Sequence, residues 1–108
     1  MTFEKLFAEY MKSPQFRKLA DSSKQMYMYS GDLVSKHFKS KDIKKIRRSD
    51  LLSFQSKNSE RAATANAALR VVSVVFAYAL DMDLVDHNPA ARMRKLKIGS
   101  SLLHKFII

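Results

Sequence analysis

Residues 60–82 read ERAATANAALRVVSVVFAYALDM, and this stretch decides the fold. Apolar residues recur through it at the spacing of one helix face, in an unbroken stripe of Ala65, Leu69, Val72, Phe76 and Ala79. Four more apolar residues widen that stripe until little polar surface remains after Arg70: Val71, Val75, Tyr78 and Leu80. A helix that is apolar nearly all round is buried. We therefore predict one long helix at the centre of a helical bundle.

Two further helices are predicted on the N-terminal side of this stretch. Residues 2–11 carry apolar side chains at i, i+3, i+4, i+7 and i+8, with Thr2 placed to cap the helix. Pro14 interrupts the pattern, because the residue before a proline is disfavoured in helical conformation. Ser22 and Gln25 have the spacing of a capping box and predict a second helix over about 23–38. Gly31 within it costs about 1 kcal/mol relative to alanine unless a neighbour packs closely there.

Shorter helices are predicted on either side of the long one. Ser49 is expected to cap a helix over 50–57, with Asp50 at the positive end of its dipole. That helix would bury Phe54 and either Leu51 or Leu52. Asn88-Pro89 predicts a last short helix, with the asparagine as cap and the proline in the first turn. The expected fold class is all-α, a compact bundle of four to five helices in one domain over residues 1–97.

Composition excludes several classes of site. The 108 residues contain no cysteine, which excludes disulfides, thiolate metal sites and a cysteine nucleophile. Glycines at positions 31 and 99 alone cannot build a phosphate-binding glycine loop. The three histidines, at 37, 87 and 104, lack metal-site spacing, so we expect no cofactor and no metal. The longest apolar run is half the roughly 20 residues of a membrane span, and the N-terminus lacks the features of a secretory leader.

The net charge of +10 favours an anionic partner, nucleic acid ahead of an acidic membrane. The positive charge gathers in three groups. The first lies in the 36–48 run, tethered by Ile43 and Ile46, and includes Lys41, Lys44, Lys45, Arg47 and Arg48. The second, at the start of the long helix, combines Arg61, Thr64, Asn66 and Arg70; the third comprises Arg92, Arg94 and Lys95. Lysine and arginine neutralise phosphates, while threonine and asparagine can fix the register on the backbone. A solvated face would explain any one group, but three on one small domain favour a binding surface.

The order of motifs resembles the core-binding domain of phage integrases, the tyrosine recombinases. The resemblance covers about residues 2–97 and is carried by SKQMY (23–27), IRRSDL (46–51), ATAN (63–66), FAYA (76–79) and NPA (88–90). It implies a SAM-like helical bundle that grips one side of a DNA duplex while a separate catalytic domain grips the other. It also implies DNA contacts at Lys24, Arg61, Thr64, Asn66 and Arg70, with Arg92, Arg94 and Lys95 near the linker that crosses the duplex.

The same resemblance places the catalytic Arg, Lys, His-x-x-Arg and Tyr in that other domain, and this sequence contains no His-x-x-Arg. We therefore expect a non-catalytic part of a recombinase in a phage or bacterial cytoplasm. Its expected partners are double-stranded DNA, a catalytic domain in cis and further protomers on the DNA, with no membrane partner. Residues 98–108 would be a linker, the start of the catalytic domain or a vector-derived segment.

Two other functions are weighed against this one. The alternative is a basic helical protein-interaction module that meets an acidic partner or its own copies, supported by the apolar residues 102–108. A helix-turn-helix regulator is weaker, because no pair of short helices joined by a tight turn precedes a polar recognition helix.

Overall fold

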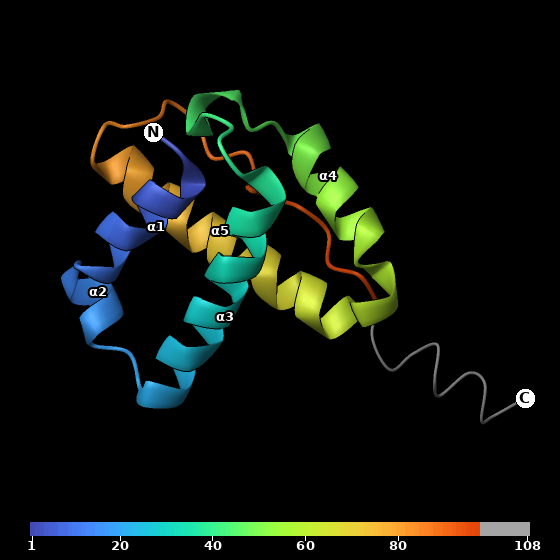
Figure 1. Ribbon diagram of the computed structural model, residues 1–108, viewed down its shortest axis with the longest axis horizontal. Coiled ribbons are helices and arrows are strands. Elements are labelled where there is room, and N and C mark those ends of the chain that lie inside the picture. Colours follow the sequence, from blue (N-terminus) through green and yellow to red (C-terminus); the bar gives the residue numbers. More distant parts are fainter. Residues whose placement is uncertain (98–108) are drawn as a thin grey trace, which may run out of the picture.

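The long helix α5 (Ala62–Asp81) lies in the middle of the fold, where α1, α3 and α4 all pack against it (Figure 1). The computed structural model describes residues 1–97, and these form five α-helices, two short 3-10 turns and one isolated β-bridge between Thr2 and Asp42. The whole predicted stripe of α5 is buried, together with Ala68, Val71 and Val75. The all-α fold class and the central position of this helix are therefore confirmed.

The N-terminal region forms α1 (Phe3–Met11) and α2 (Pro14–Arg17). Thr2 caps α1 as predicted, since its Oγ1 accepts the Lys5 backbone N–H at 3.2 Å. The break before Pro14 is also confirmed, but α2 was not predicted. Proline suits the first position of a helix because that position needs no N–H donor. The side chain of Ser13 caps the new helix by accepting the Phe16 N–H at 3.3 Å.

Helix α3 (Asp21–Phe38) begins two residues earlier than predicted. Its N-cap is Ala20, which makes no side-chain capping bond, so the predicted capping box of Ser22 and Gln25 is wrong. Gly31 lies where α3 meets α1: a Cβ added there would be 2.5 Å from the Phe7 ring. The glycine therefore allows the two helices to approach closely, and this contact explains its place inside a helix.

Helix α4 (Arg48–Lys57) follows η1 (Ile43–Lys45) and is joined to α5 by η2 (Ser59–Arg61). The predicted cap at Ser49 is wrong: the N-cap is Arg47, whose N–H donates to the Asp50 carboxylate at 2.8 Å. Leu51 and Phe54 are buried while Leu52 is 47% exposed, which decides the alternative left open above. Ile43 and Ile46 are buried and tether the basic run, as predicted.

No helix follows α5 within the described residues, so the predicted last helix at Asn88-Pro89 is wrong. Asn88 does act like a cap, since its Oδ1 accepts the Ala90 N–H at 3.0 Å. The chain then turns and continues without helical structure to residue 97, with Arg92 in the left-handed region at φ 61°. The predicted break at 99–101 and the apolar residues 102–108 lie outside the described residues.

Residues 59–81 are long and apolar enough, by length and composition alone, to cross a membrane. The core helix of a folded domain passes the same test. Here α5 buries its apolar stripe against α1, α3 and α4, so its composition is explained by packing inside this fold.

Candidate nucleic-acid interface

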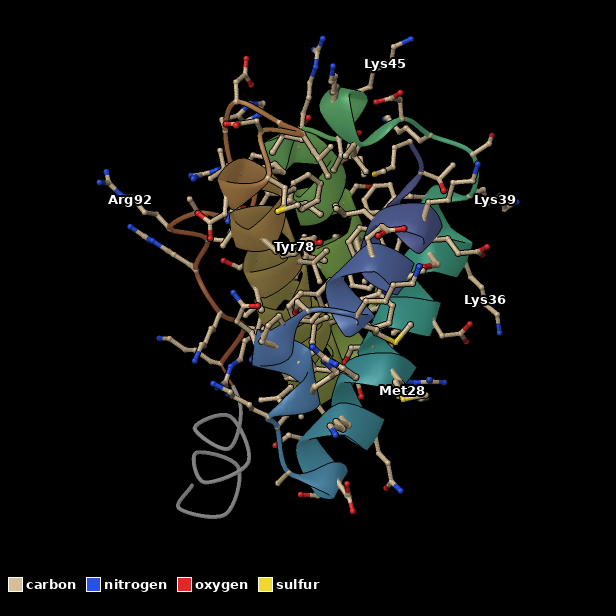
Figure 2. All side chains as sticks on the ribbon, turned by 90° about the vertical axis from the view of Figure 1, so that its left-hand side faces the viewer. Met28, Lys36, Lys39, Lys45, Tyr78 and Arg92 are labelled. Atoms are coloured by element: carbon tan, nitrogen blue, oxygen red, sulfur yellow. The ribbon has the colours of Figure 1, made fainter. Side chains whose placement is uncertain are left out.

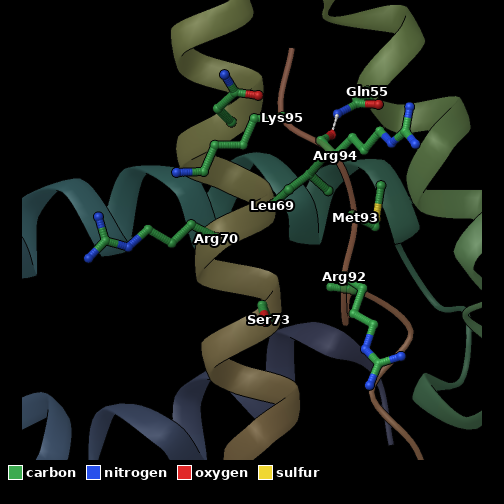
Figure 3. Close-up of a pocket in the computed structure, with 10 residues that line it drawn as sticks. Gln55, Leu69, Arg70, Ser73, Arg92, Met93, Arg94 and Lys95 are labelled. Atoms are coloured by element: carbon green, nitrogen blue, oxygen red, sulfur yellow. Dashed lines mark hydrogen bonds between the residues drawn. The ribbon is translucent and has the colours of Figure 1, made fainter. Parts of the chain in front are cut away.

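A groove of about 300 Å³ lies between α5 and the returning chain, residues 88–96, which we call the strap (Figure 3). Its walls include Asn66, Leu69 and Ser73 of α5 and Gln55 of α4. Four cationic side chains line it, and no acidic residue does: Arg70, Arg92, Arg94 and Lys95. The fold thus brings the third basic group of the sequence together with Arg70 and Asn66 of the second.

Two asparagines hold the strap against α5. Near its start, Asn88 Nδ2 donates to the carbonyl oxygen of Ser73 at 2.9 Å. Near its end, Asn66 Oδ1 accepts the Leu96 N–H and Asn66 Nδ2 donates to the Leu96 carbonyl, both at 2.8 Å. The strap therefore runs antiparallel to α5, with both ends fixed to that helix.

Helix α4 holds the strap from the other side. The buried Gln55 donates from Nε2 to the Arg94 carbonyl at 2.8 Å, and the guanidinium of Arg48 donates to the Ala91 carbonyl. Ala90 is buried and Met93 packs against the core, so the middle of the strap is also held by apolar contact. The backbone of the strap is thus tied to both helices.

The strap's charged side chains are exposed around the groove. Figure 3 shows Lys95 extending to the same side of α5 as Arg70, whereas Arg92 and Arg94 extend to the other side. None of the strap's cations forms an ion pair within the described residues, so they remain free to meet a ligand. The groove therefore presents positive charge on both sides of one helix.

The other residues predicted at the start of the long helix lie outside the groove. Arg61 is exposed at the N-cap position of α5, where no side chain caps the helix and no acidic residue occupies the first turn. Thr64 is half-buried and, at 100° per residue, lies about 120° round α5 from Arg70. Lys24 is half-buried in the first turn of α3. The starts of α3 and α5 both lie in the lower half of Figure 1.

The basic run 36–48 does not form one face. In Figure 2, Lys36 and Lys39 lie at the edge opposite Arg92, and Lys45 lies at the top. Lys41 pairs with Asp50 at 3.1 Å, and Arg48 is engaged by the strap. Apart from Arg48, four exposed cations of the run have no ion pair in the described part of the chain: Lys39, Lys44, Lys45 and Arg47.

Two acidic groups near this run are stabilised in their charged form. The Arg47 N–H, with the ammonium of Lys41, holds the pKa of Asp50 below its usual range. The Lys44 N–H and the N-terminal ammonium lower the pKa of Asp42 in the same way. Both carboxylates therefore offset nearby positive charge, which leaves the groove, with no carboxylate in its lining, as the stronger anion site.

Histidine and carboxylate chemistry is sparse. Burial lowers the pKa of His37, whose ring meets Phe54 edge-on with centroids 5.1 Å apart. Over residues 1–97, no group of three or more histidine, aspartate and glutamate residues could hold a metal ion. His37 therefore serves as a neutral ring packed between α3 and α4.

Gln55 is the residue of this site that sequence reasoning missed. It follows Leu51 and Phe54 at i+4 and i+1, so it lies on the buried face of α4, where a glutamine is unusual. A polar residue in an apolar stripe could have indicated a buried partner. Its partner, the Arg94 carbonyl, carries no such signal because it belongs to the backbone.

The comparisons with known proteins give one match. The family model of the phage integrase central domain matches residues 3–96. That range contains every helix of the fold and all four cations of the groove. Comparison with curated proteins and with solved structures finds no match.

Proposed function

Because this chain belongs to the phage integrase central-domain family, as the resemblance predicted, we propose that it is a DNA-binding core-binding domain. It would position duplex DNA for strand exchange by the separate catalytic domain of a tyrosine recombinase. One observation carries the proposal: four cations from α5 and the strap surround a single groove with no carboxylate in its lining. A surface of that kind is suited to the phosphate backbone, whose contacts supply most non-specific affinity.

The groove would hold the phosphates, and residues around it would extend the contact. Lys24 and Arg61 are proposed at the starts of α3 and α5, where helix N-termini favour anions. Lys44, Lys45 and Arg47 are proposed as outer contacts because they are exposed and free of ion pairs in the described chain. Lys41 and Arg48 are proposed only as weaker contacts, since each is engaged within the protein.

The two uncharged candidates differ. Thr64 is half-buried at the start of α5 and stays a proposed backbone contact. Asn66 is also proposed at the interface, but both polar atoms of its amide are bonded to Leu96. The rest of the proposal follows from the family: an attachment-site duplex as partner, further protomers on the DNA, and a phage or bacterial cytoplasm.

The test is a binding titration against salt. A labelled duplex would be titrated by fluorescence anisotropy at several KCl concentrations, with the wild type and the double variant Arg70→Ala/Arg94→Ala. Two lost phosphate contacts should weaken binding to every duplex and flatten the plot of log K against log [salt] by about 1.8, at roughly 0.9 per contact. The matched control is Lys36→Ala/Lys39→Ala, which removes the same charge from the opposite edge (Figure 2).

The control should keep a salt slope close to that of the wild type. Equal affinity and slope in the groove variant and the wild type would refute the proposed surface. A wild-type protein that binds no duplex even at low salt would favour the alternative, a basic protein-interaction module.

A further inference from the structure

We propose that Asn66 and Gln55 are positioning residues, whose amides hold the strap so that its cations stay around the groove. This inference rests on the proposed function and adds what keeps the binding surface assembled. Neither amide needs to touch DNA for its loss to weaken binding. The argument comes from the hydrogen bonds between the helices and the strap.

Asn66 pairs with the strap as a neighbouring strand would. Its amide oxygen and nitrogen bond to the N–H and carbonyl of one residue, Leu96, both at 2.8 Å. Arg70 lies one helical turn further along α5 on nearly the same face. Fixing Leu96 to Asn66 therefore holds the preceding residue, Lys95, so that its side chain extends to the same side of α5 as Arg70, as Figure 3 shows.

Gln55 fixes the strap two residues earlier and from another helix. Its Nε2 donates to the Arg94 carbonyl at 2.8 Å, and its side chain is buried between α4 and the strap. Arg94 is thus tied to α4 while Leu96 is tied to α5, with Lys95 between the two anchors. Both the direction and the register of residues 94–96 are set by these two amides.

Little else holds this end of the strap. Ala90 is buried and Met93 packs on the core, but Arg94 and Lys95 are exposed and Leu96 is only half-buried. Without the amide bonds, residues 94–96 would have no buried apolar side chain to keep them beside α5. The cationic side chains of Arg94 and Lys95 would then occupy many positions, and each would contact a phosphate for a smaller fraction of the time.

This role differs from the base contact that an asparagine in a DNA-binding helix can make. Asparagine reads adenine through its amide oxygen and nitrogen together. In Asn66 those two atoms are already bonded to Leu96. A positioning role and a base contact therefore predict different results for the same substitution.

The experiment combines amide hydrogen exchange with DNA binding. Wild type, Asn66→Ala and Gln55→Ala are compared, with Asn58→Ala as the matched control because its amide bonds to Phe54 within α4 and not to the strap. In Asn66→Ala, exchange of the Leu96 N–H should be at least about tenfold faster, since that N–H loses its acceptor. Asn66→Asp keeps an acceptor for this N–H but sets a second acceptor against the Leu96 carbonyl, so it should restore only part of the protection.

DNA binding provides the second readout. Asn66→Ala and Gln55→Ala should each weaken binding equally on duplexes of unrelated sequence and flatten the salt slope by about one contact. Asn58→Ala should change neither measurement. Unchanged exchange at Leu96 in Asn66→Ala would overturn the inference, and so would a sequence-selective loss of affinity with Leu96 still protected.

The two proposals fail in different ways. Faster exchange at Leu96 with unchanged DNA affinity overturns the positioning role, while Arg70→Ala/Arg94→Ala can still weaken binding and uphold the proposed function. If that double variant also leaves binding unchanged, the proposed function itself fails and the inference fails with it.

Discussion

The two sides of α5 are held by different interactions. On one side, α1 and α3 pack with aromatic and aliphatic side chains, and the Phe3 and Phe76 rings lie 6.3 Å apart. On the other, the strap is tied down largely by side-chain amides that bond to backbone groups. The first side should therefore set the free energy of unfolding. The second should fix where the strap's cationic side chains lie around the groove.

The largest effect is expected in the apolar side. Phe76→Ala removes a ring that is 1% exposed, and the free energy of unfolding should fall by about 3–5 kcal/mol. Urea denaturation followed by circular dichroism measures this loss. Met82→Ala, at a residue that is 55% exposed, is the control and should change stability little. A loss below about 1 kcal/mol for Phe76→Ala would mean that this ring of α5 is not closely packed against α1.

Gly31→Ala should have the next largest effect. The new methyl group would press on the Phe7 ring, an overpacking cost of about 1–3 kcal/mol, while alanine returns about 1 kcal/mol of helix propensity. A net loss of up to about 2 kcal/mol is expected by urea denaturation. Phe7→Leu in the same chain should recover part of it, because contacting residues are not additive. If the stability losses of Gly31→Ala and Phe7→Leu simply add in the double variant, the close contact between these two residues is contradicted.

Substitutions of Arg92 distinguish the effect of backbone strain in the strap from the effect of its positive charge. Glycine adopts φ near 61° without the strain of a Cβ atom, so stability should rise by roughly 0.5–1 kcal/mol. Arg92→Ala keeps the strained conformation and should give no such gain. Both variants remove one cation and should weaken DNA binding to the same extent in the anisotropy titration. A stability gain in both would contradict the explanation by φ.

The smallest effect concerns pH. The pKa of Asp50 is lowered in the folded protein, so its contribution is present above the unfolded value of about 3.9 and is lost as pH falls toward the folded pKa. Asp50→Asn should cost about 0.5 kcal/mol at pH 7, a small amount because solvent screens the group. Urea denaturation should show that the free energies of unfolding of Asp50→Asn and the wild type differ less at pH 3 than at pH 7. A constant difference would contradict the ionic origin.

Sequence periodicity predicted the elements that apolar burial defines, including α1 and the central α5. In α4 the prediction included Phe54, left Leu51 and Leu52 as alternatives, and missed Gln55. Local capping signals were less successful, because polar side chains have several partners within reach. Arg47 is the N-cap of α4 where Ser49 was expected, with its N–H bonded to Asp50. Asn88 donates to the Ser73 carbonyl where a new helix was expected to begin. Contacts between residues far apart in the chain therefore determine which of the possible local capping bonds form.

The candidate site was only partly predictable for a related reason. Charge and the family resemblance pointed to Arg70, Arg92, Arg94 and Lys95, but not to their convergence on one groove. That convergence depends on bonds between residues far apart in the chain, such as Asn66 with Leu96, 30 positions away. No local pattern encodes such a bond, since one partner is the backbone.

The strap contains more chain than is needed to join its two anchor points on α5. Its end anchors on α5, Ser73 and Asn66, are seven residues apart, which is about 10 Å of helix rise. The strap covers this distance with the eight steps from Asn88 to Leu96, which would reach roughly 26 Å if extended. If the Asn66 pair, the bonds from Gln55 and Arg48 and the contacts of Ala90 and Met93 all opened, about 15 Å of chain would be released while every helix stays folded. A segment joined beyond residue 97 could then move farther from the helices, but the cations around the groove would lose their fixed positions.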